Sequence, residues 1–349
     1  MKLKSRSRLS LKFLFAFIVF FPLLFWKRSA HADLKGDKDM GSLLLGAQSA
    51  PVLPRISLPR ICLVYDENVF FYFEDWLNPL LFSLGMFFDV VKMPYPISGI
   101  RSGDTVLLLQ LTHGLRKVEG VEYWFLNTEG PDKRYAELAI ANGFTKIIDY
   151  DLYNTERLAA NGADTTLWLP IIHPPTVALH TYRDKLCMIG GANTPRREPV
   201  YHKINRLAQE RELPVSIYEV EGWGLSRDVV SQTCALVVNI ASVQSNPATP
   251  RMRLDLLWLW DIPIISELSA GRDLLEYSGT VSFVTLEQLP GATLDLWENI
   301  MLQKRDSIAS SLQRASKRQT VQQRRMEQYQ FVVRSIASYA LNRTKHALL

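Results

Sequence analysis

Cysteine is scarce in this chain, with three residues, Cys62, Cys187 and Cys234, among 349. Cysteines so few and so widely spaced exclude a disulfide framework and a cysteine-based zinc site. Cys62 and Cys187 fall inside predicted strands, where cysteine behaves as a small apolar side chain. We therefore expect both to be buried thiols.

Several nucleotide-binding signatures are absent as well. The sequence has no GxxxxGK[ST] loop, which excludes a P-loop nucleotidase, and GGANTP at residues 190–195 is not the GxGxxG fingerprint of a dinucleotide-binding enzyme. No Asp-x-Asp motif is predicted at a convincing strand end, which argues against a metal that bridges a diphosphate. We therefore expect neither a metal ion nor another cofactor.

The formal net charge of +5 is distributed unevenly. Residues 1–28 carry seven basic and no acidic side chains, and residues 291–349 carry ten basic and four acidic ones. These two segments account for +7 and +6, so the remainder of the chain carries −8. Because phosphate neutralisation needs basic residues on the folded face, nucleic acid is not an expected partner of the core.

The N-terminal segment, residues 1–28, is predicted to address a membrane. Five cationic residues precede the apolar run Phe13–Trp26, and Lys27 and Arg28 close it. We favour an uncleaved single-pass anchor, whose basic flank keeps the N-terminus cytoplasmic and places the body on the lumenal or extracytoplasmic side. The alternative is a cleaved signal peptide, because Ala30–Ala32 fits a small-x-small cleavage site. In either case the body crosses a membrane.

Residues 29–56 mix charge, Gly, Ser and Pro without periodicity and are predicted to be a stem or linker. In residues 57–175, short apolar runs then alternate with helix-like stretches, which predicts a mostly parallel sheet built from βαβ units. The predicted strands are Ile61–Tyr65, Phe87–Met93, Thr105–Leu111, Tyr123–Asn127, Lys146–Tyr150 and Thr166–Ile171, and two predicted helices are Asp132–Asn142 and Leu152–Ala160.

The alternation breaks near Pro174-Pro175, a predicted interdomain connection, and restarts in residues 176–290. The fold class is therefore α/β, with two doubly wound, Rossmann-like domains and ligand sites at the carboxyl ends of strands. The strands expected here are Leu186–Gly190, Pro214–Tyr218, Ala235–Ile240, Pro263–Ser266 and Val281–Val284, and the helices are Glu198–Glu212, Ser226–Gln232, Arg251–Trp260 and Ala270–Tyr277.

Residues 291–349 are predicted to form a C-terminal helical tail. Its Gln, Lys and Arg residues indicate a solvated face around a few apolar positions. These positions are Leu312, Met326, Phe331, Val332 and Ile336. We expect the basic charge of the tail to be solvated rather than to bind a partner.

Several motifs occur in the order expected of one known family. The first half of the chain contains LNTEG, IDYDLYN and WLPIIHPP at residues 126–130, 148–154 and 168–175. The second half contains Ile189-Gly190-Gly191, Arg196-Arg197, Gly224 before Arg227-Asp228, then VVNI, Arg253 and Ser266-Glu267. Over about residues 126–289 the chain resembles the retaining glycosyltransferases of the "glycosyl transferases group 1" type, in the bacterial and viral branch with a small N-terminal domain. The resemblance implies a GT-B arrangement, with an acceptor side at 57–175 and a donor side at 176–290.

The resemblance implies a metal-independent site in which cations match the charge of the donor diphosphate. Gly190 and Gly191 let the backbone approach a phosphate, and Arg196 or Arg197 begins the following helix. Arg227 and Arg253 are further candidates for donor binding. An arginine pair at the start of a helix is also commonly solvent-exposed, and this structural reading remains open.

Carboxylates and aromatic rings complete the predicted site. Glu267 directly follows a predicted strand and is the preferred acidic residue, although it also fits a first-turn acid of the next helix. Glu129 and His113 follow strands of the first domain and are candidate catalytic or acceptor-binding residues, and His173 is another histidine of this kind. The segment that carries an acidic pair in the family has only Asp255 as a substitute. Trp223 is a candidate for stacking on a sugar ring.

We therefore expect a glycosyltransferase that moves a sugar from a nucleotide-sugar donor to a glycan, lipid or protein acceptor. One alternative is a non-catalytic GT-B-like protein that keeps the cleft but has lost the acidic pair. Another is a solute-binding module, which also has two α/β domains behind a signal peptide. Convergence of Arg196, Arg253 and Glu267 on one place would favour a donor site.

Overall fold

The computed structural model describes residues 58–95, 98–110, 116–128, 134–173, 183–220, 225–241, 251–268, 276–302 and 308–347. Leu58–Leu349 forms one compact unit. The predicted anchor and stem, the Pro174-Pro175 connection, His113, Glu129 and Trp223 lie outside the described residues. None of the described helices is both long enough and apolar enough to cross a bilayer.

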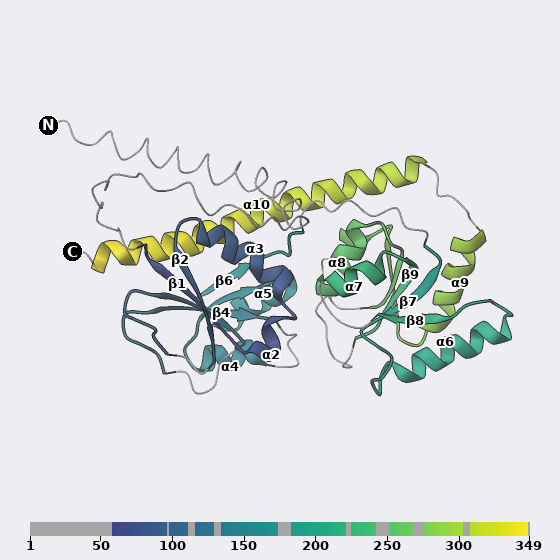
Figure 1. Ribbon diagram of the computed structural model, residues 1–349, viewed down its shortest axis with the longest axis horizontal. Helices are drawn as coiled ribbons and strands as arrows, with labels where there is room; N and C mark the ends of the chain where they lie inside the picture. The colour runs from purple at the N-terminus through teal and green to yellow at the C-terminus, as the bar shows by residue number, and fades with distance from the viewer. Residues whose placement is uncertain are drawn as a thin grey trace, which may run out of the picture. The chain divides into compact units, whose positions relative to one another are not determined.

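The first half of the described chain forms a six-stranded parallel sheet in the order β2-β1-β3-β4-β5-β6 (Figure 1). Every residue of β3 and β4 is buried, as expected for central strands of a parallel sheet covered on both faces. The strands are β1 Arg60–Tyr65, β2 Asp89–Pro94, β3 Thr105–Leu109, β4 Glu122–Asn127, β5 Lys146–Asp149 and β6 Thr165–Trp168.

Helices cover both faces of this sheet. One core contains side chains of α3 (Glu74–Gly85), such as Trp76 and Leu80, packed with Leu107 and Trp124 of the strands. The opposite core contains side chains of α4 (Tyr135–Ala141) and α5 (Leu152–Ala160) packed on the other strand faces. The short helix α2 (Glu67–Phe70) follows β1 directly. The predicted βαβ architecture of this half is therefore confirmed.

The second half forms a five-stranded parallel sheet in the order β11-β10-β9-β7-β8. Its strands are β7 Lys185–Ile189, β8 Ile217–Val220, β9 Cys234–Asn239, β10 Ile264–Glu267 and β11 Val281–Val284. Helices α6 (Glu198–Glu210) and α9 (Leu289–Leu302) share one core, and α8 (Arg251–Leu259) lies in the other; α7 is Leu225–Ser231. The predicted range of β8, Pro214–Tyr218, begins three residues and ends two residues before the observed strand, because the segment before Ile217 continues the apolar run.

Each sheet has a point at which the chain changes direction across it. From β1 the chain passes to β2 on one side and then to β3 on the other, and from β7 it passes to β8 and then to β9. Ligands of doubly wound sheets bind outside the carboxyl ends of the strands at such a switch point. We therefore expect a ligand to bind at the segments that follow β1 and β3, or at those that follow β7 and β9.

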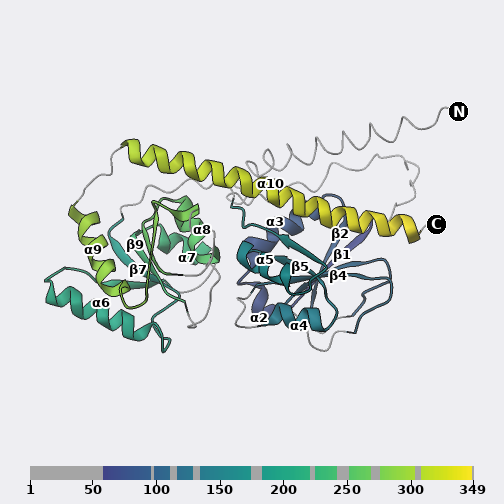
Figure 2. The ribbon, with the colours of Figure 1, turned by 180° about the vertical axis from the view of Figure 1, so that it is seen from behind.

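The C-terminal helix α10 (Ile308–Ala347) packs against both halves of the chain (Figures 1 and 2). Val321 belongs to a core of the second sheet, whereas Val332 and Ile336 belong to a core of the first. Met326 and Phe331 are exposed, so only part of the predicted apolar set is buried. The prediction of a wholly solvated basic face was wrong for Arg325, which is fully buried.

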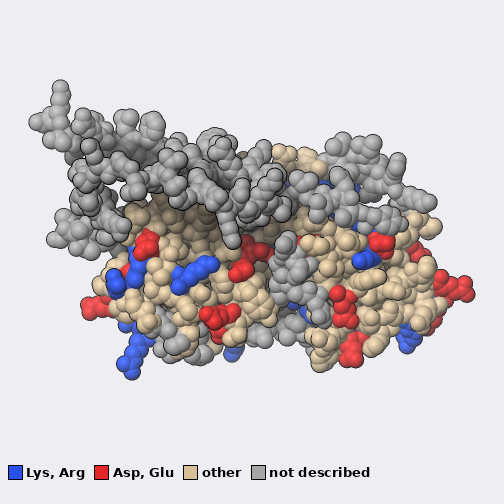
Figure 3. Space-filling model, in the orientation of Figure 1, with Lys and Arg blue, Asp and Glu red and all other residues tan. Residues whose placement is uncertain are grey.

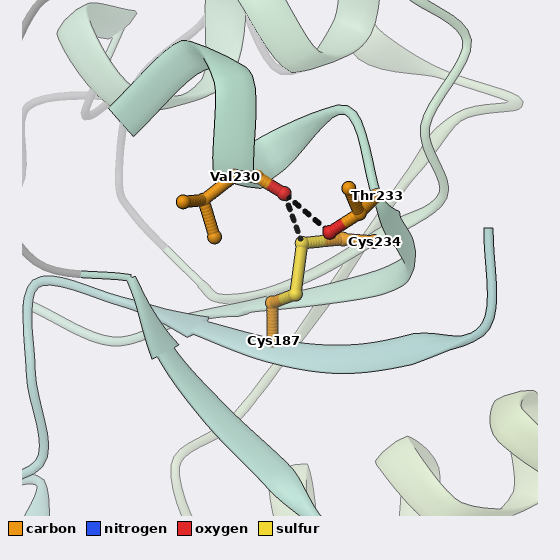
Figure 4. Close-up of a disulfide and its surroundings, with 4 residues drawn as sticks. All are labelled: Cys187, Val230, Thr233 and Cys234. Atoms are coloured by element: carbon orange, nitrogen blue, oxygen red, sulfur yellow. Dashed lines mark hydrogen bonds between the residues drawn. A yellow bond between two sulfur atoms is a disulfide. The ribbon is translucent and has the colours of Figure 1, made fainter. Parts of the chain in front are cut away.

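Cys187 and Cys234 form a disulfide between the neighbouring strands β7 and β9 (Figure 4). The expectation that Cys187 is a free thiol was therefore wrong, because strand pairing brings together two residues that are 47 positions apart. The expectation for Cys62 is confirmed: it is a buried free thiol whose pKa is raised to about 12, mainly by burial.

Candidate functional site

The loop after β7 begins with two glycines in a left-handed backbone conformation. Gly190 has φ +88° and Gly191 has φ +69°, which side chains larger than hydrogen rarely adopt. A Cβ atom on Gly190 would lie 2.8 Å from Nη1 of Arg197. The glycine therefore allows a guanidinium to lie directly against the backbone at the switch point of the second sheet.

Arg197 is buried at this edge of the sheet. Its Nε donates a hydrogen bond to the carbonyl oxygen of Ile240 at 3.0 Å, and its Nη1 donates to the carbonyl oxygen of Gly190. Burial lowers the pKa of Arg197. Its Nη2 is buried and has no hydrogen-bond partner in the described part of the chain. The guanidinium thus holds the loop in place and has one donor atom left for a ligand.

Arg196 and Glu267 form an ion pair across the same edge. Glu267 is the last residue of β10, and its Oε2 accepts a hydrogen bond of 3.1 Å from the amide of Ala241. The side chains are mostly buried, at 16% and 15% exposure. Nε of Arg196 is also buried without a partner among the described residues. Arg196 and Glu267 therefore lie together at the carboxyl edge of the second sheet.

Arg253 and Asn239 complete this group of residues. Nη1 of Arg253 lies 3.4 Å from the carbonyl oxygen of Ile240, to which Arg197 also donates. Asn239, the last residue of β9, donates from Nδ2 to Oγ of Ser266 at 2.9 Å. Its Oδ1 is buried, and no described residue donates to it. Sequence reasoning missed Asn239, although its place at the end of a buried strand was the available signal.

The residues at this edge are called the switch-point cluster below. The cluster lies at the carboxyl edge of the second sheet and includes three arginines and one glutamate. Its members are Gly190, Gly191, Arg196, Arg197, Asn239, Arg253 and Glu267. The local excess of positive charge and the unused donor atoms suit an anionic group such as a phosphate. The unused acceptor of Asn239 suits a hydroxyl.

Arg227 lies elsewhere. Its buried guanidinium donates to Asp228 at 2.9 Å, to Asp75 of α3 at 3.3 Å and to the carbonyl oxygen of Met252 at 3.2 Å. These partners lie on α7, α3 and α8, so Arg227 links helices of the two halves. We therefore leave Arg227 out of the switch-point cluster.

Asp255 also has a different environment from the one predicted. Its carboxylate is fully buried and accepts two hydrogen bonds from Arg325 of α10, at 2.9 and 3.2 Å, and one from the hydroxyl of Tyr277. Arg251 and Glu276 extend this network through ion pairs. The carboxylate of Asp255 links α8 to α10 through these contacts. Asp255 is therefore not a member of the candidate site.

The corresponding edge of the first sheet carries uncharged and acidic groups. Asn127 of β4 donates to Asp149 of β5 at 2.6 Å, and the amide of Asp151 donates to the same carboxylate at 2.8 Å. Burial, and then the neighbouring charge of Asp151, raises the pKa of Asp149 well above its usual range. On the adjacent strands, Gln110 follows β3 and donates to the hydroxyl of Thr128.

Asp149 and Asp151 form an Asp-x-Asp motif at the end of β5, so the expectation that no such motif follows a strand was wrong. Asp149 is bound by Asn127, and Asp151 accepts a hydrogen bond from the amide of Asn154 as the N-cap of α5. Across the described residues, no three His, Cys, Asp or Glu side chains are grouped so that they could hold a metal ion. The motif here has a structural role.

His173 is the one predicted histidine that the structure describes. Its Nε2 is buried, with no hydrogen bond from or to the described residues. Burial lowers its pKa, with opposing effects from Asp255 and Asp75. His173 is therefore neutral near pH 7, and it lies near the Asp255 network rather than in the switch-point cluster.

The described chain thus contains two parallel α/β sheets, and a cluster of arginines lies at the carboxyl edge of the second sheet. No protein-family profile matches the chain, and no curated protein sequence matches it. Similar solved structures include the glycotransferase of kitacinnamycin, at 9% identity and TM-score 0.47, covering 80% of this chain and 99% of that one.

Two further similar structures are TarM and a putative epimerase. TarM has 9% identity and TM-score 0.44 over 69% of this chain, which spans 54% of the length of TarM. A putative UDP-N-acetylglucosamine 2-epimerase from Listeria monocytogenes has 10% identity and TM-score 0.42, covering 75% of this chain and 90% of that one. At these similarities the function has to be argued from the residues of the chain itself.

Proposed function

We propose that this protein is a glycosyltransferase that uses a nucleotide-sugar donor. The donor diphosphate binds at the switch-point cluster, against the Gly190-Gly191 turn and the guanidinium groups of Arg196 and Arg197. The observation that carries this proposal is the set of buried polar atoms with no partner in the described chain: Arg196 Nε, Arg197 Nη2 and Asn239 Oδ1. Buried polar groups are normally satisfied, so three at one switch point indicate a place for a ligand.

The residue types fit the reaction. In the transfer step, the bond between the anomeric carbon of the sugar and the diphosphate breaks, and a bond to an acceptor oxygen forms. The nucleoside diphosphate leaves with both bonding electrons, and its phosphate oxygen takes up the proton that the acceptor hydroxyl loses. Arg196 and Arg197 stabilise the charge that develops on this leaving group, as preorganised cations do in other sites.

Glu267 has a specific place in this proposal. In this structure its carboxylate is paired with Arg196 and accepts a hydrogen bond from the amide of Ala241. When Arg196 turns to a phosphate, Glu267 can accept a hydrogen bond from a donor hydroxyl. We extend the proposal to a metal-independent reaction with retention of configuration, both of which the family resemblance implies.

We also propose that the body of the protein lies in an oxidising compartment, on the lumenal or extracytoplasmic side of a membrane. The disulfide between Cys187 and Cys234 supports this placement, because such bonds persist in oxidising compartments and are rare in the cytosol. On the face shown in Figure 3, acidic and basic side chains are interspersed, which supports the expectation that nucleic acid is not a partner.

Calorimetry on the full chain tests the donor site. UDP, GDP and CMP are titrated into the wild type, Arg196→Ala and Arg206→Ala. Arg206 is the matched control, since its side chain is 67% exposed on helix α6, which follows Arg196, and it forms an ion pair with the exposed Glu210. We expect one nucleotide to bind in the micromolar range, with Arg196→Ala weakening it on the order of tenfold or more.

The result that overturns the proposal is the absence of binding by every nucleotide to a protein whose fold is verified by circular dichroism. Binding that Arg196→Ala and Arg206→Ala weaken equally would place the nucleotide elsewhere. If the nucleotide binds as expected but its sugar is never released or transferred, the chain is the non-catalytic GT-B-like binding protein.

A further inference from the structure

Four consecutive aromatic residues follow the first strand, and they divide between the core and the surface. Phe70 and Phe73 are buried, whereas Phe71 is 45% exposed and Tyr72 is 39% exposed. The ring centroids of the two exposed residues are 3.8 Å apart. Phe71 and Tyr72 are called the aromatic pair below. The two buried rings belong to the core of the first sheet, whereas the two exposed rings present part of their surface to solvent.

The aromatic pair lies in the segment that follows β1, at the carboxyl edge of the first sheet. β1 ends at Tyr65, and α2 and the pair follow before α3 begins at Glu74. Because the chain reverses direction across the sheet between β1 and β3, this segment flanks the switch point. Asp75, in the first turn of α3, pairs with Arg227 of α7 at 3.3 Å, which ties this segment to the half that carries the switch-point cluster.

The charges around the pair restrict what it can bind. Residues 66–75 contain four acidic residues and no basic one. Asp66 caps α2 by accepting from the amide of Asn68 at 2.8 Å, and Asp75 is paired, while Glu67 and Glu74 are exposed. Exposed carboxylates repel phosphate and carboxylate groups and accept hydrogen bonds from hydroxyls.

A sugar ring has both of the complementary features. Its C–H face is apolar and packs on an aromatic ring, and its hydroxyls donate hydrogen bonds at the edge of the ring. We propose that Phe71 and Tyr72 bind a ring of an uncharged saccharide, which is the acceptor of the transferase. This inference rests on the proposed function and adds to it the class of acceptor and two residues that recognise it.

The probes for this proposal are maltotriose and chitotriose, titrated into the full chain both alone and in the presence of any nucleotide found to bind. The variants are Phe71→Ala and Tyr72→Ala. The matched control is Phe82→Ala, because Phe82 is an aromatic residue of α3 in the same half of the chain and is 56% exposed. Thermal unfolding of each variant verifies its fold.

We expect one trisaccharide to bind, with Phe71→Ala or Tyr72→Ala raising its Kd on the order of tenfold and Phe82→Ala leaving it unchanged. Nucleotide affinity stays the same in all three variants. Failure of both trisaccharides to bind, or an equal effect of Phe82→Ala, overturns the proposal. The proposal is also overturned if Phe71→Ala and Tyr72→Ala abolish binding to phosphatidylcholine vesicles and leave saccharide binding unchanged. That result would make the pair a membrane contact.

The two proposals fail in distinguishable ways. If the nucleotide binds and Arg196→Ala abolishes this binding while neither trisaccharide binds, the aromatic pair is not an acceptor site and the donor site stands. If a trisaccharide binds through Phe71 and Tyr72 but no nucleotide binds, the protein is a saccharide-binding protein and the transferase proposal fails.

Discussion

Breaking the bond between Cys187 and Cys234 should strongly destabilise the second half of the protein. The bond joins two adjacent strands, β7 and β9, and both cysteines are fully buried in one core (Figure 4). The perturbation is reduction of the wild-type disulfide, compared with the double variant Cys187→Ala/Cys234→Ala.

The magnitude follows from the length of chain that the bond closes. A crosslink stabilises a protein mainly by restricting the unfolded chain, and the effect grows with the logarithm of the number of residues enclosed. The sequence separation here is 47 residues. For a loop of that length, the chain-entropy relation predicts a contribution of about 4 kcal/mol at 25 °C. Reduction should lower the free energy of unfolding by about this amount.

The assay is guanidinium unfolding followed by circular dichroism, with and without reductant, in a Cys62→Ala background that removes the remaining cysteine. We expect the midpoint of the oxidised protein to fall to a lower denaturant concentration on reduction. The double alanine variant should unfold at one midpoint whether or not reductant is present.

Alkylation of the denatured, unreduced full chain counts the thiols independently. One modified cysteine, Cys62, is expected, and three are expected only after reduction. Three modified cysteines before reduction, in protein made in an oxidising compartment, would refute the bond. An unchanged midpoint after verified reduction would refute the energetic reasoning.

The remaining predictions concern the switch-point glycine, the buried ion network and a buried histidine. Gly190→Ala should lower the free energy of unfolding by about 1–3 kcal/mol, because its backbone has a positive φ and the new Cβ meets Arg197. It should also weaken nucleotide binding in calorimetry. Gly162→Ala is the control for backbone strain alone, because Gly162 has φ +92° and no atom within 4 Å of the added Cβ. Asp255→Asn should lower the free energy of unfolding by about 3–5 kcal/mol, since Arg325 would lose its buried carboxylate partner. Asp295→Asn, at the exposed pair with Arg211, should change it by less than about 1 kcal/mol. Equal effects of the two substitutions in urea unfolding would contradict this prediction. Burial lowers the pKa of His173 in the folded state. The folded protein therefore favours the neutral imidazole, and the free energy of unfolding falls as the pH drops below about 6.5, the pKa of histidine in the unfolded chain. His173→Gln should therefore reduce the loss of stability on acidification through that range, and the exposed His202 is the control for the same substitution.

Much of the local structure was predictable from sequence because parallel strands leave a simple signal. The runs around Leu107 and Phe125 are continuously apolar, as strands covered on both faces must be. Glu267 and the Gly190-Gly191 turn were also predictable, because each follows such a run directly and the carboxyl ends of parallel strands share one edge. β8 was misplaced because a short edge strand carries a weaker pattern.

Other site features depend on partners that are remote in sequence. Arg196 and Glu267 are 71 residues apart, and Asp255 and Arg325 are 70 apart. Nothing in the residues near Asp255 distinguishes a carboxylate that binds a sugar from one that is buried against α10. The contact of Arg227 with Asp75 could not be predicted for the same reason, since the two residues are 152 positions apart.

The sequence by itself determined the α/β class, the positions of the central strands and the glycine and arginine residues of the loop after β7. Hydrophobic periodicity and backbone conformation depend on residues that are close together in the sequence, so a short stretch of sequence is enough to predict them. The tertiary structure alone decided that Cys187 pairs with Cys234, that Asn239 joins the arginines and that Asp255 pairs with Arg325. These choices depend on which strands and helices become neighbours, and that follows from burying the cores of the whole chain together.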